Sequence, residues 1–347
     1  MPKPDNRRQF LRKAGLGATA ALLPLAYSSC EEEKTPTKTA PPSRIVGHGN
    51  FTYEADLKWN SGNTAAHPVM HCHEMVLDSR GRLVCSTVSE KADVLVYNKD
   101  GKILDSFKHG LVEPHGFTKA GEGSDQTFWL TDSESGRVIN LGLDGQLIRE
   151  LDVPDDLIPE GKQFKPTETT VASNGDVYVA DGYGTNLIFH FDGQGKLVNS
   201  FGGPDHFDCC HGITLDERRS TPELLITSRA AQNFQRWSLN GEHLQTHELP
   251  GLQICRPVIS GAETLFAVIV TTSWWHYDGM VAILDKDFNV LSLPGGSSPV
   301  GLDNYNDVNW DGETFMNPHD VCADEDGNLY VPQWYSGRTH PVRLKRV

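Results

Sequence analysis

One short unit recurs six times along the chain, and a repeat of this kind constrains the fold more than any other feature. Each copy contains a first strand, a second strand of β-branched and aromatic residues, and a third strand that runs into an Asp-Gly or Asn-Gly turn. The copies begin 42 to 63 residues apart, as four-stranded propeller blades with loop insertions do. They begin at His73, His115, Thr167, His211, Arg256 and His319. The sequence therefore predicts an all-β, six-bladed β-propeller.

The two ends of the repeat array indicate how the ring closes. The last unit stops at Val347 after about three strands, whereas residues 51–59 (FTYEADLKW) alternate like a strand that has no partner nearby. Pairing of this N-terminal strand with the last blade leaves no open sheet edge. No stretch shows sustained helical periodicity, so we expect almost no helix.

The first 43 residues carry targeting information and are excluded from the fold. Residues 6–13 (NRRQFLRK) are typical of a twin-arginine export signal, and the apolar residues 14–26 are too few to span a bilayer. We expect a signal peptide over 1–29, a flexible linker over 30–43 and the propeller over 44–347. Cys30 stands where bacterial lipoproteins are lipidated, so lipid anchoring in the cell envelope and soluble release into the periplasm both remain open.

The charge of the chain limits its partners. The whole chain carries −15, and the first 29 residues are net positive, so the propeller is more acidic still. Such a surface repels phosphate backbones, and we expect no nucleic-acid partner. We expect a monomer that acts on a small molecule or peptide and contacts the membrane only through a lipid on Cys30.

Six cysteines follow Cys30, and in an exported protein they can pair. Cys72 and Cys85 form the most plausible bridge, because both are expected on the strands of one short hairpin. A thiolate metal site is the alternative, but the chain contains no CxxC pair.

Histidine recurs at one position of the repeat. The first strand of a propeller blade lines the central channel, so equivalent residues from different blades converge on the axis. Three neutral imidazoles with an open fourth position are a common ligand set of catalytic zinc. We therefore predict zinc on His115, His211 and His319. His73 holds the same position in the first blade, where a fourth ligand, a hydrogen-bond partner or a channel filler all remain open.

Four motifs resemble the lyase domain of peptidylglycine α-amidating enzyme, peptidyl-α-hydroxyglycine α-amidating lyase. These motifs are residues 164–167 (FKPT), 181–186 (DGYGTN), 210–212 (CHG) and 318–320 (PHD). The likeness covers about residues 75–347 and is more specific than a general NHL-type repeat. It implies a six-bladed propeller whose zinc ligands are His115, His211 and His319, the residues already chosen from the repeat.

The same resemblance implies roles for further residues. Tyr183 would be the catalytic base, and Arg229 would supply positive charge near the substrate carboxylate. A structural calcium would be held by the main-chain carbonyls of Met75 and Phe117 and by the carboxylate of Asp320. In the family's reaction a hydroxyl beside an amide nitrogen loses its proton, and the carbon–nitrogen bond breaks to give an aldehyde acid and an amide.

The chain departs from this family in two places. Residues 87–89 (TVS) stand where the family has a second active-site arginine after the second strand of the first blade. The family's two disulfides also have no counterpart, since Lys165 and Gly184 replace the first pair. We therefore expect a zinc-dependent lyase that cleaves a C–N or similar bond beside a hydroxylated carbon, in a substrate other than a glycine-extended peptide.

Two other functions remain open. A non-catalytic exported propeller could bind a partner or a glycan, and the adjacent aromatic residues 274–277 (WWHY) favour it. A calcium-dependent lactonase propeller is less consistent with the sequence, because calcium prefers carboxylate and amide oxygens to imidazole.

Overall fold

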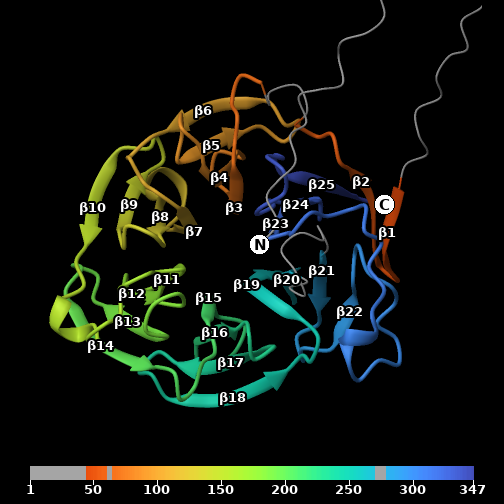
Figure 1. Cartoon of the computed structure of the whole chain (residues 1–347). Helices are drawn as coiled ribbons and strands as arrows, with labels where there is room; N and C mark the ends of the chain where they lie inside the picture. Colours follow the sequence, from red (N-terminus) through yellow and green to blue (C-terminus); the bar gives the residue numbers. More distant parts are fainter. Residues whose placement is uncertain (1–43, 61–64, 270–278) are drawn as a thin grey trace, which may run out of the picture. The chain divides into compact units, whose positions relative to one another are not determined.

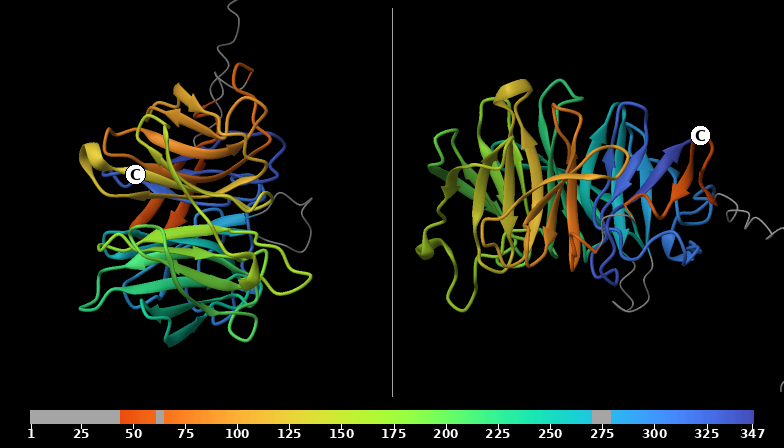
Figure 2. Two further views of the ribbon diagram at one scale, coloured as in Figure 1. Left: turned by 90° about the vertical axis from the view of Figure 1, so that its left-hand side faces the viewer. Right: turned by 90° about the horizontal axis from the view of Figure 1, so that it is seen from above.

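The computed structural model describes residues 44–60, 65–269 and 279–347. In these residues the strands form six sheets arranged as a ring, with one strand of each sheet innermost (Figure 1). Two side views show the sheets packed face to face around that ring (Figure 2). The predicted all-β, six-bladed propeller is confirmed. The expected signal peptide, linker and Cys30 lie outside the described residues.

Five of the blades are four-stranded antiparallel sheets formed by consecutive strands. Blade 1 comprises β3 (His71–Leu77), β4 (Leu83–Val88), β5 (Val94–Tyr97) and β6 (Ile103–Phe107). Blade 2 comprises β7 (Pro114–Ala120), β8 (Thr127–Asp132), β9 (Val138–Gly142) and β10 (Leu147–Leu151). Blade 3 comprises β11 (Glu168–Val171), β12 (Val177–Ala180), β13 (Leu187–Phe191) and β14 (Leu197–Gly202). Blade 4 comprises β15 (Cys210–Asp216), β16 (Glu223–Ser228), β17 (Asn233–Ser238) and β18 (His243–Glu248). Blade 5 comprises β19 (Gln253–Ser260), β20 (Glu263–Ile269), β21 (Gly279–Leu284) and β22 (Val290–Ser292).

Blade 6 joins the two ends of the ring. Its sheet order is β1–β2–β25–β24–β23, in which β1 (Arg44–His48) and β2 (Phe51–Asp56) precede all other strands in the chain. The C-terminal strands are β23 (Cys322–Ala323), β24 (Leu329–Val331) and β25 (Val342–Arg346). β2 pairs antiparallel with β25, with Tyr53 opposite Arg346. The predicted closure is confirmed, and β1 adds a fifth strand that we did not expect.

Helical elements in the described part are three single-turn 3-10 helices. They are η1 (Gly123–Asp125), η2 (Asp155–Leu157) and η3 (Tyr305–Asp307). None of the described helices has the length and apolar character that a membrane span requires.

The apolar core lies between neighbouring blades. Between blades 1 and 2, for example, Val84 and Val96 pack with Phe117, Phe128 and Leu130. The rings of Phe117 and Phe128 are stacked with centroids 5.2 Å apart. Because each blade buries both of its faces in this way, the position of every innermost strand is fixed by its two neighbours.

A β-bulge interrupts the first strand of four blades at the same place. The register shifts lie between Cys72 and Met75, Pro114 and Phe117, Cys210 and Ile213, and Ile254 and Pro257. A bulge leaves a backbone amide without its ladder partner and redirects side chains. In blades 2 and 4 a threonine of the second strand accepts that hydrogen bond: Gly116 N donates to Thr131 Oγ1 (2.8 Å) and Gly212 N to Thr227 Oγ1 (2.7 Å).

Glycine follows the histidine in blades 2 and 4 because adjacent first strands approach closely. A Cβ on Gly116 would lie 2.4 Å from the carbonyl oxygen of Thr167 in the next blade. A Cβ on Gly212 would lie 2.6 Å from Cα of Arg256. No larger residue fits these positions without moving the neighbouring strand.

The expected disulfide between Cys72 and Cys85 is not formed, and both residues are buried free thiols. The bulge in β3 takes the two residues out of cross-strand register, so that Cys85 lies opposite Met75, while Cys72 lies opposite Thr87. The two thiols still interact: burial raises the pKa of Cys85 well above its ordinary value, and the hydrogen bond with Cys72 adds to this effect.

Candidate functional site

Four imidazole rings meet at the axis of the ring. The centroids of His115, His211 and His319 are 4.8 to 5.0 Å apart and form a nearly equilateral triangle. His73 lies beside this triangle, 4.7 Å from His115 and 4.9 Å from His319. All four side chains belong to residues that are at most 2% exposed. The structure thus brings together every histidine that the shared repeat position selected.

Backbone carbonyls orient three of these rings. In each, the Nδ1–H donates to a carbonyl oxygen of an adjacent blade: His73 to Pro114 (2.7 Å), His115 to Thr167 (2.8 Å) and His319 to His73 (3.2 Å). Such a bond fixes the tautomer and leaves Nε2 with its lone pair, as in most metal-binding histidines. Nδ1 of His211 is buried and has no hydrogen-bond partner among the described residues.

Burial keeps the four imidazoles neutral. Loss of solvation lowers the pKa of His115 to about 3, and it lowers the pKa of His73, His211 and His319 well below the ordinary value. Neutral imidazoles are the form that binds zinc, so this donor set fits a transition metal. Within the described part of the chain, two groups offer ligand atoms within 4.8 Å of one another: His73 with His115 and His319, and Cys255 with His211 and His319. Each group contains two of the three predicted zinc ligands.

A tyrosine hydroxyl lies between two of the predicted ligands. Tyr183 Oη is 3.2 Å from Nε2 of His115 and 3.0 Å from Nε2 of His211. Arg229, which follows β16, donates from Nη2 to the same oxygen over 3.2 Å and stacks on the tyrosine ring. Tyr183 is 39% exposed, but its hydroxyl faces the buried histidines. Loss of solvation there raises the pKa of Tyr183 to about 12, while the positive charge of Arg229 acts in the opposite direction.

An aspartate at the end of β12 holds the loop that carries Tyr183. The carboxylate of Asp181 accepts hydrogen bonds from the amide of Lys165 (2.6 Å) and from both the amide (2.7 Å) and the hydroxyl (2.6 Å) of Thr185. The residue is fully buried, so these bonds are shielded from water. The loop therefore presents Tyr183 to the histidines in a fixed position.

Two site residues were not singled out from the sequence. Glu113 Oε1 lies 3.5 Å from Nε2 of His73, and burial raises the pKa of this glutamate to about 7, with the charges of Asp132 and Glu134 adding to the effect. Cys255 is fully buried beside His211 and His319. Glu113 stands in the Glu-Pro-His-Gly motif, and this closeness to His115 in the sequence was the signal that could have identified it. Cys255, and not Arg256 as the repeat alignment predicted, holds the histidine position of blade 5, because the bulges of blades 4 and 5 place it as the counterpart of His211.

The atoms expected to hold calcium do lie together, but a side chain occupies the space between them. The guanidinium of Arg256 donates to the carbonyls of Phe117 (2.8 Å) and Met75 (3.4 Å) and to the carboxylate of Asp320 (2.5 Å). These residues therefore do not fit a calcium ion in this chain. The aromatic residues 274–277 lie outside the described residues.

Comparison with known proteins identifies relatives of the chain. No family model matches it. It is 27% identical over 267 residues to a probable peptidyl-alpha-hydroxyglycine alpha-amidating lyase of Caenorhabditis elegans, across 72% of this chain and 70% of that protein. It is 30% identical to peptidyl-alpha-hydroxyglycine alpha-amidating lyase 1 of Drosophila melanogaster, across 69% of this chain and 46% of the fly protein. It is also 30% identical to human NHL repeat-containing protein 3, across 53% of this chain and 56% of that protein.

The match thus spans less than two thirds of the fly and human relatives. Among solved structures, virginiamycin B lyase from Staphylococcus aureus superposes with a TM-score of 0.50 over 78% of each chain at 16% identity, a likeness of fold alone. The chain is therefore a six-bladed β-propeller related in sequence to the peptidyl-α-hydroxyglycine α-amidating lyases and the NHL repeat-containing proteins.

Proposed function

We propose that this protein is a lyase that binds zinc on His115, His211 and His319 and cleaves a C–N or similar bond beside a hydroxylated carbon. One observation carries the proposal. The hydroxyl of Tyr183 lies within hydrogen-bond distance of Nε2 of His115 and of His211, and it accepts a hydrogen bond from Arg229. Relatives that are named amidating lyases support the class of reaction.

Each residue of the site would have a separate chemical role in the reaction. A bound zinc would act as a Lewis acid toward the substrate hydroxyl. Tyr183 would accept the hydroxyl proton at Oη, and the hydrogen bond and charge of Arg229 favour the ionised form of that tyrosine. Arg229 is half-buried, so part of its guanidinium remains available to a substrate carboxylate or carbonyl. The backbone carbonyls behind the rings of His73, His115 and His319 keep the Nε2 atoms of these three histidines in place as the proton moves.

The blade 1 side of the site supports a substrate other than an α-hydroxyglycine peptide. Residues 87–89 stand where the resemblance implies a second arginine, and the hydroxyl of Thr87 donates to the carbonyl of His71 (2.7 Å). The titratable group near His73 is the carboxyl of Glu113, whose pKa is raised by burial to about 7. A negative group at this end of the substrate would be repelled by the ionised form of Glu113 and would bind less well than a neutral group. We propose a small hydroxylated or carbonyl-bearing molecule that is neutral or cationic at this end.

Metal content is the first test. Mass spectrometry of the purified mature protein should find about one zinc per chain, and the combined His115→Ala, His211→Ala and His319→Ala variant should lose it. His190→Ala is the matched control, because His190 is also buried but is bonded to Asp176 in blade 3 and lies outside the four-ring cluster. Absence of any bound transition metal from the wild type would contradict the proposal and favour a propeller that binds a partner or glycan.

Turnover is the second test. The zinc-loaded protein should cleave a member of a panel of hydroxylated small amides, and Tyr183→Phe should retain zinc but lose most of this activity. Family-like turnover of an α-hydroxyglycine model peptide would refute the substrate class while leaving the lyase reaction intact.

A further inference from the structure

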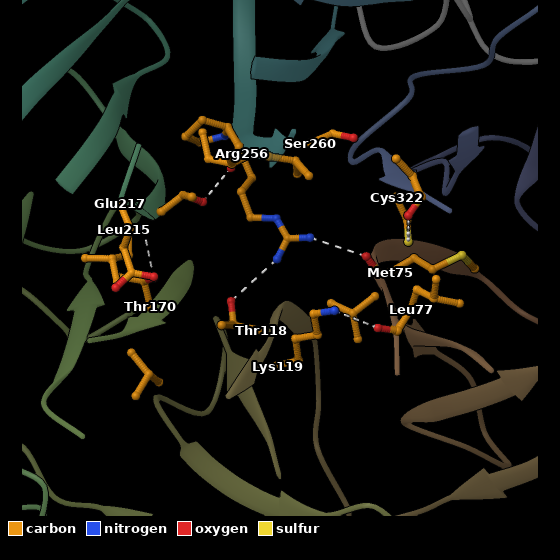
Figure 3. A pocket seen from close by; sticks show the side chains of 17 residues that line it. Met75, Leu77, Thr118, Lys119, Thr170, Leu215, Glu217, Arg256, Ser260 and Cys322 are labelled. Atoms are coloured by element: carbon orange, nitrogen blue, oxygen red, sulfur yellow. Dashed lines mark hydrogen bonds between the residues drawn. The ribbon is translucent and has the colours of Figure 1, made fainter. Parts of the chain in front are cut away.

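Arg256 of β19 lies at the meeting point of five blades. Its Nη1 contacts the carbonyl of Phe117 (2.8 Å), and its Nη2 contacts the carbonyl of Met75 (3.4 Å), as the close view shows for Met75 (Figure 3). Its guanidinium also forms ion pairs with three carboxylates, from Glu74 (3.1 Å), Glu168 (3.6 Å) and Asp320 (2.5 Å). The oxygen atoms come from blades 1, 2 and 3 and from the segment that precedes β23, while the arginine comes from blade 5.

Among the residues that the structure describes, Arg256 is the cation that forms ion pairs with these three carboxylates. All three residues are 0% exposed, and Arg256 is 6% exposed. A buried carboxylate without a cation is strongly unfavourable, so a positive charge is required at this point of the fold. Hydrogen bonds from the amides of Phe117 to Glu74 and of Met75 to Asp320 satisfy some carboxylate oxygens but contribute no net charge.

We infer that Arg256 is the built-in structural cation of this propeller, and that it replaces a divalent ion at the oxygen atoms of Met75, Phe117 and Asp320. The planar guanidinium carries several N–H donors that point in different directions, so one side chain can bond to separate carboxylates and carbonyls. A compact ammonium group would match this arrangement of acceptors less well. The protein therefore binds no calcium at this position and does not depend on calcium for stability. This inference is independent of the proposed lyase activity.

Arg256 also separates the central channel into two parts, with the histidine cluster on one side and a cavity on the other. Along β3 the order is His73, then Glu74 and Met75 at the arginine, then Leu77, which lines a cavity of about 420 Å³. Arg256 itself is part of the wall of that cavity (Figure 3). A ligand of the histidine cluster must therefore enter from the Tyr183 side, because the arginine and its carboxylates fill the axis behind the cluster.

The test compares calcium dependence in wild type and variants. Calcium content is measured by mass spectrometry, and the thermal midpoint is followed as calcium is added to protein that retains its zinc. Wild type should contain no stoichiometric calcium and show no midpoint change. Arg256→Ala should unfold at a lower temperature, and calcium should raise its midpoint progressively, because binding to the folded state stabilises by mass action.

A control variant and a conservative variant of Arg256 accompany this test. Arg218→Ala is the matched control: Arg218 links blades 4 and 5 through Asp216, Ala262 and Thr264, so its loss should lower the midpoint without creating a calcium response. If Arg256→Ala cannot be purified, Arg256→Lys retains a cation and should remain folded and insensitive to calcium. One calcium per wild-type chain, or a wild-type midpoint that rises with calcium, would overturn the inference.

Discussion

Replacement of Gly116 by alanine tests whether the close approach of blades 2 and 3 positions the histidine cluster. The new Cβ would lie 2.4 Å from the carbonyl oxygen of Thr167 and 2.7 Å from Cα of Glu168, and neither backbone atom can rotate away. Thr167 is also the acceptor that orients the ring of His115. The strands must therefore separate, and the same movement must displace that histidine.

The expected cost follows from these contacts. Overpacking of a well-packed interior costs about 1–3 kcal/mol. For a domain of this size, the thermal midpoint falls by about 2–4 °C for each kcal/mol. We therefore expect Gly116→Ala to lower the midpoint by several degrees in a fluorescence-detected melt and to weaken zinc binding.

Gly193→Ala is the control for this experiment, because a Cβ on Gly193 meets its nearest atoms at an ordinary 3.5 Å. That variant should be as stable as wild type or slightly more so, since alanine reduces the freedom of the unfolded chain. If Gly116→Ala had the same thermal midpoint as Gly193→Ala and bound zinc normally, glycine would not be needed after the histidine for the close approach of blades 2 and 3.

Three further predictions concern stability. Thr131→Val should lower the free energy of unfolding in urea by about 1–3 kcal/mol, because it leaves the buried amide of Gly116 without its acceptor. An unchanged free energy of unfolding would show that the threonine hydroxyl does not replace the missing strand-to-strand hydrogen bond. Tyr53→Ala should cost about 3–5 kcal/mol by opening a cavity in blade 6, and no loss would refute the closing role of β2. Burial alone would raise the pKa of Asp216, but hydrogen bonds from Arg218 hold it below its ordinary value. The carboxylate thus stabilises the fold above about pH 4 and loses this effect as the pH falls further, so the stability gap between wild type and Asp216→Asn should shrink in acid melts.

The architecture could be predicted from the sequence because each blade repeats the same local pattern. The histidine cluster followed from the same repeat, since equivalent positions in a ring must converge. The fifth strand β1 was missed, because residues 44–48 are few and gain a partner only after β2 has turned back beside them. The bulge that takes Cys72 and Cys85 out of cross-strand register was also missed, because no residue type marks it in the sequence.

The remaining site residues depend on contacts between blades. The repeat alignment placed Arg256 at the histidine position of blade 5, but this prediction is wrong by one residue: the bulge puts Cys255 at the place that corresponds to His211, and Arg256 follows it. The role of Arg256 requires oxygen atoms from distant segments of the chain. Glu113 and Cys255 approach the histidines only because adjacent first strands pack closely. Repeat register alone carries no information about such distances.

The pairing of β2 with β25 in blade 6 determines when the ring can close during synthesis and folding. Arg343 pairs with Asp56 over 2.9 Å, yet these residues are 287 positions apart, so the five other blades must all be synthesised before the partner of β2 exists. Contacts between such distant residues form slowly and late in folding. Until then β2 is a strand available to any other exposed strand. Synthesis that stops before β25 would therefore release an open array of blades that is prone to association, instead of a slightly smaller propeller.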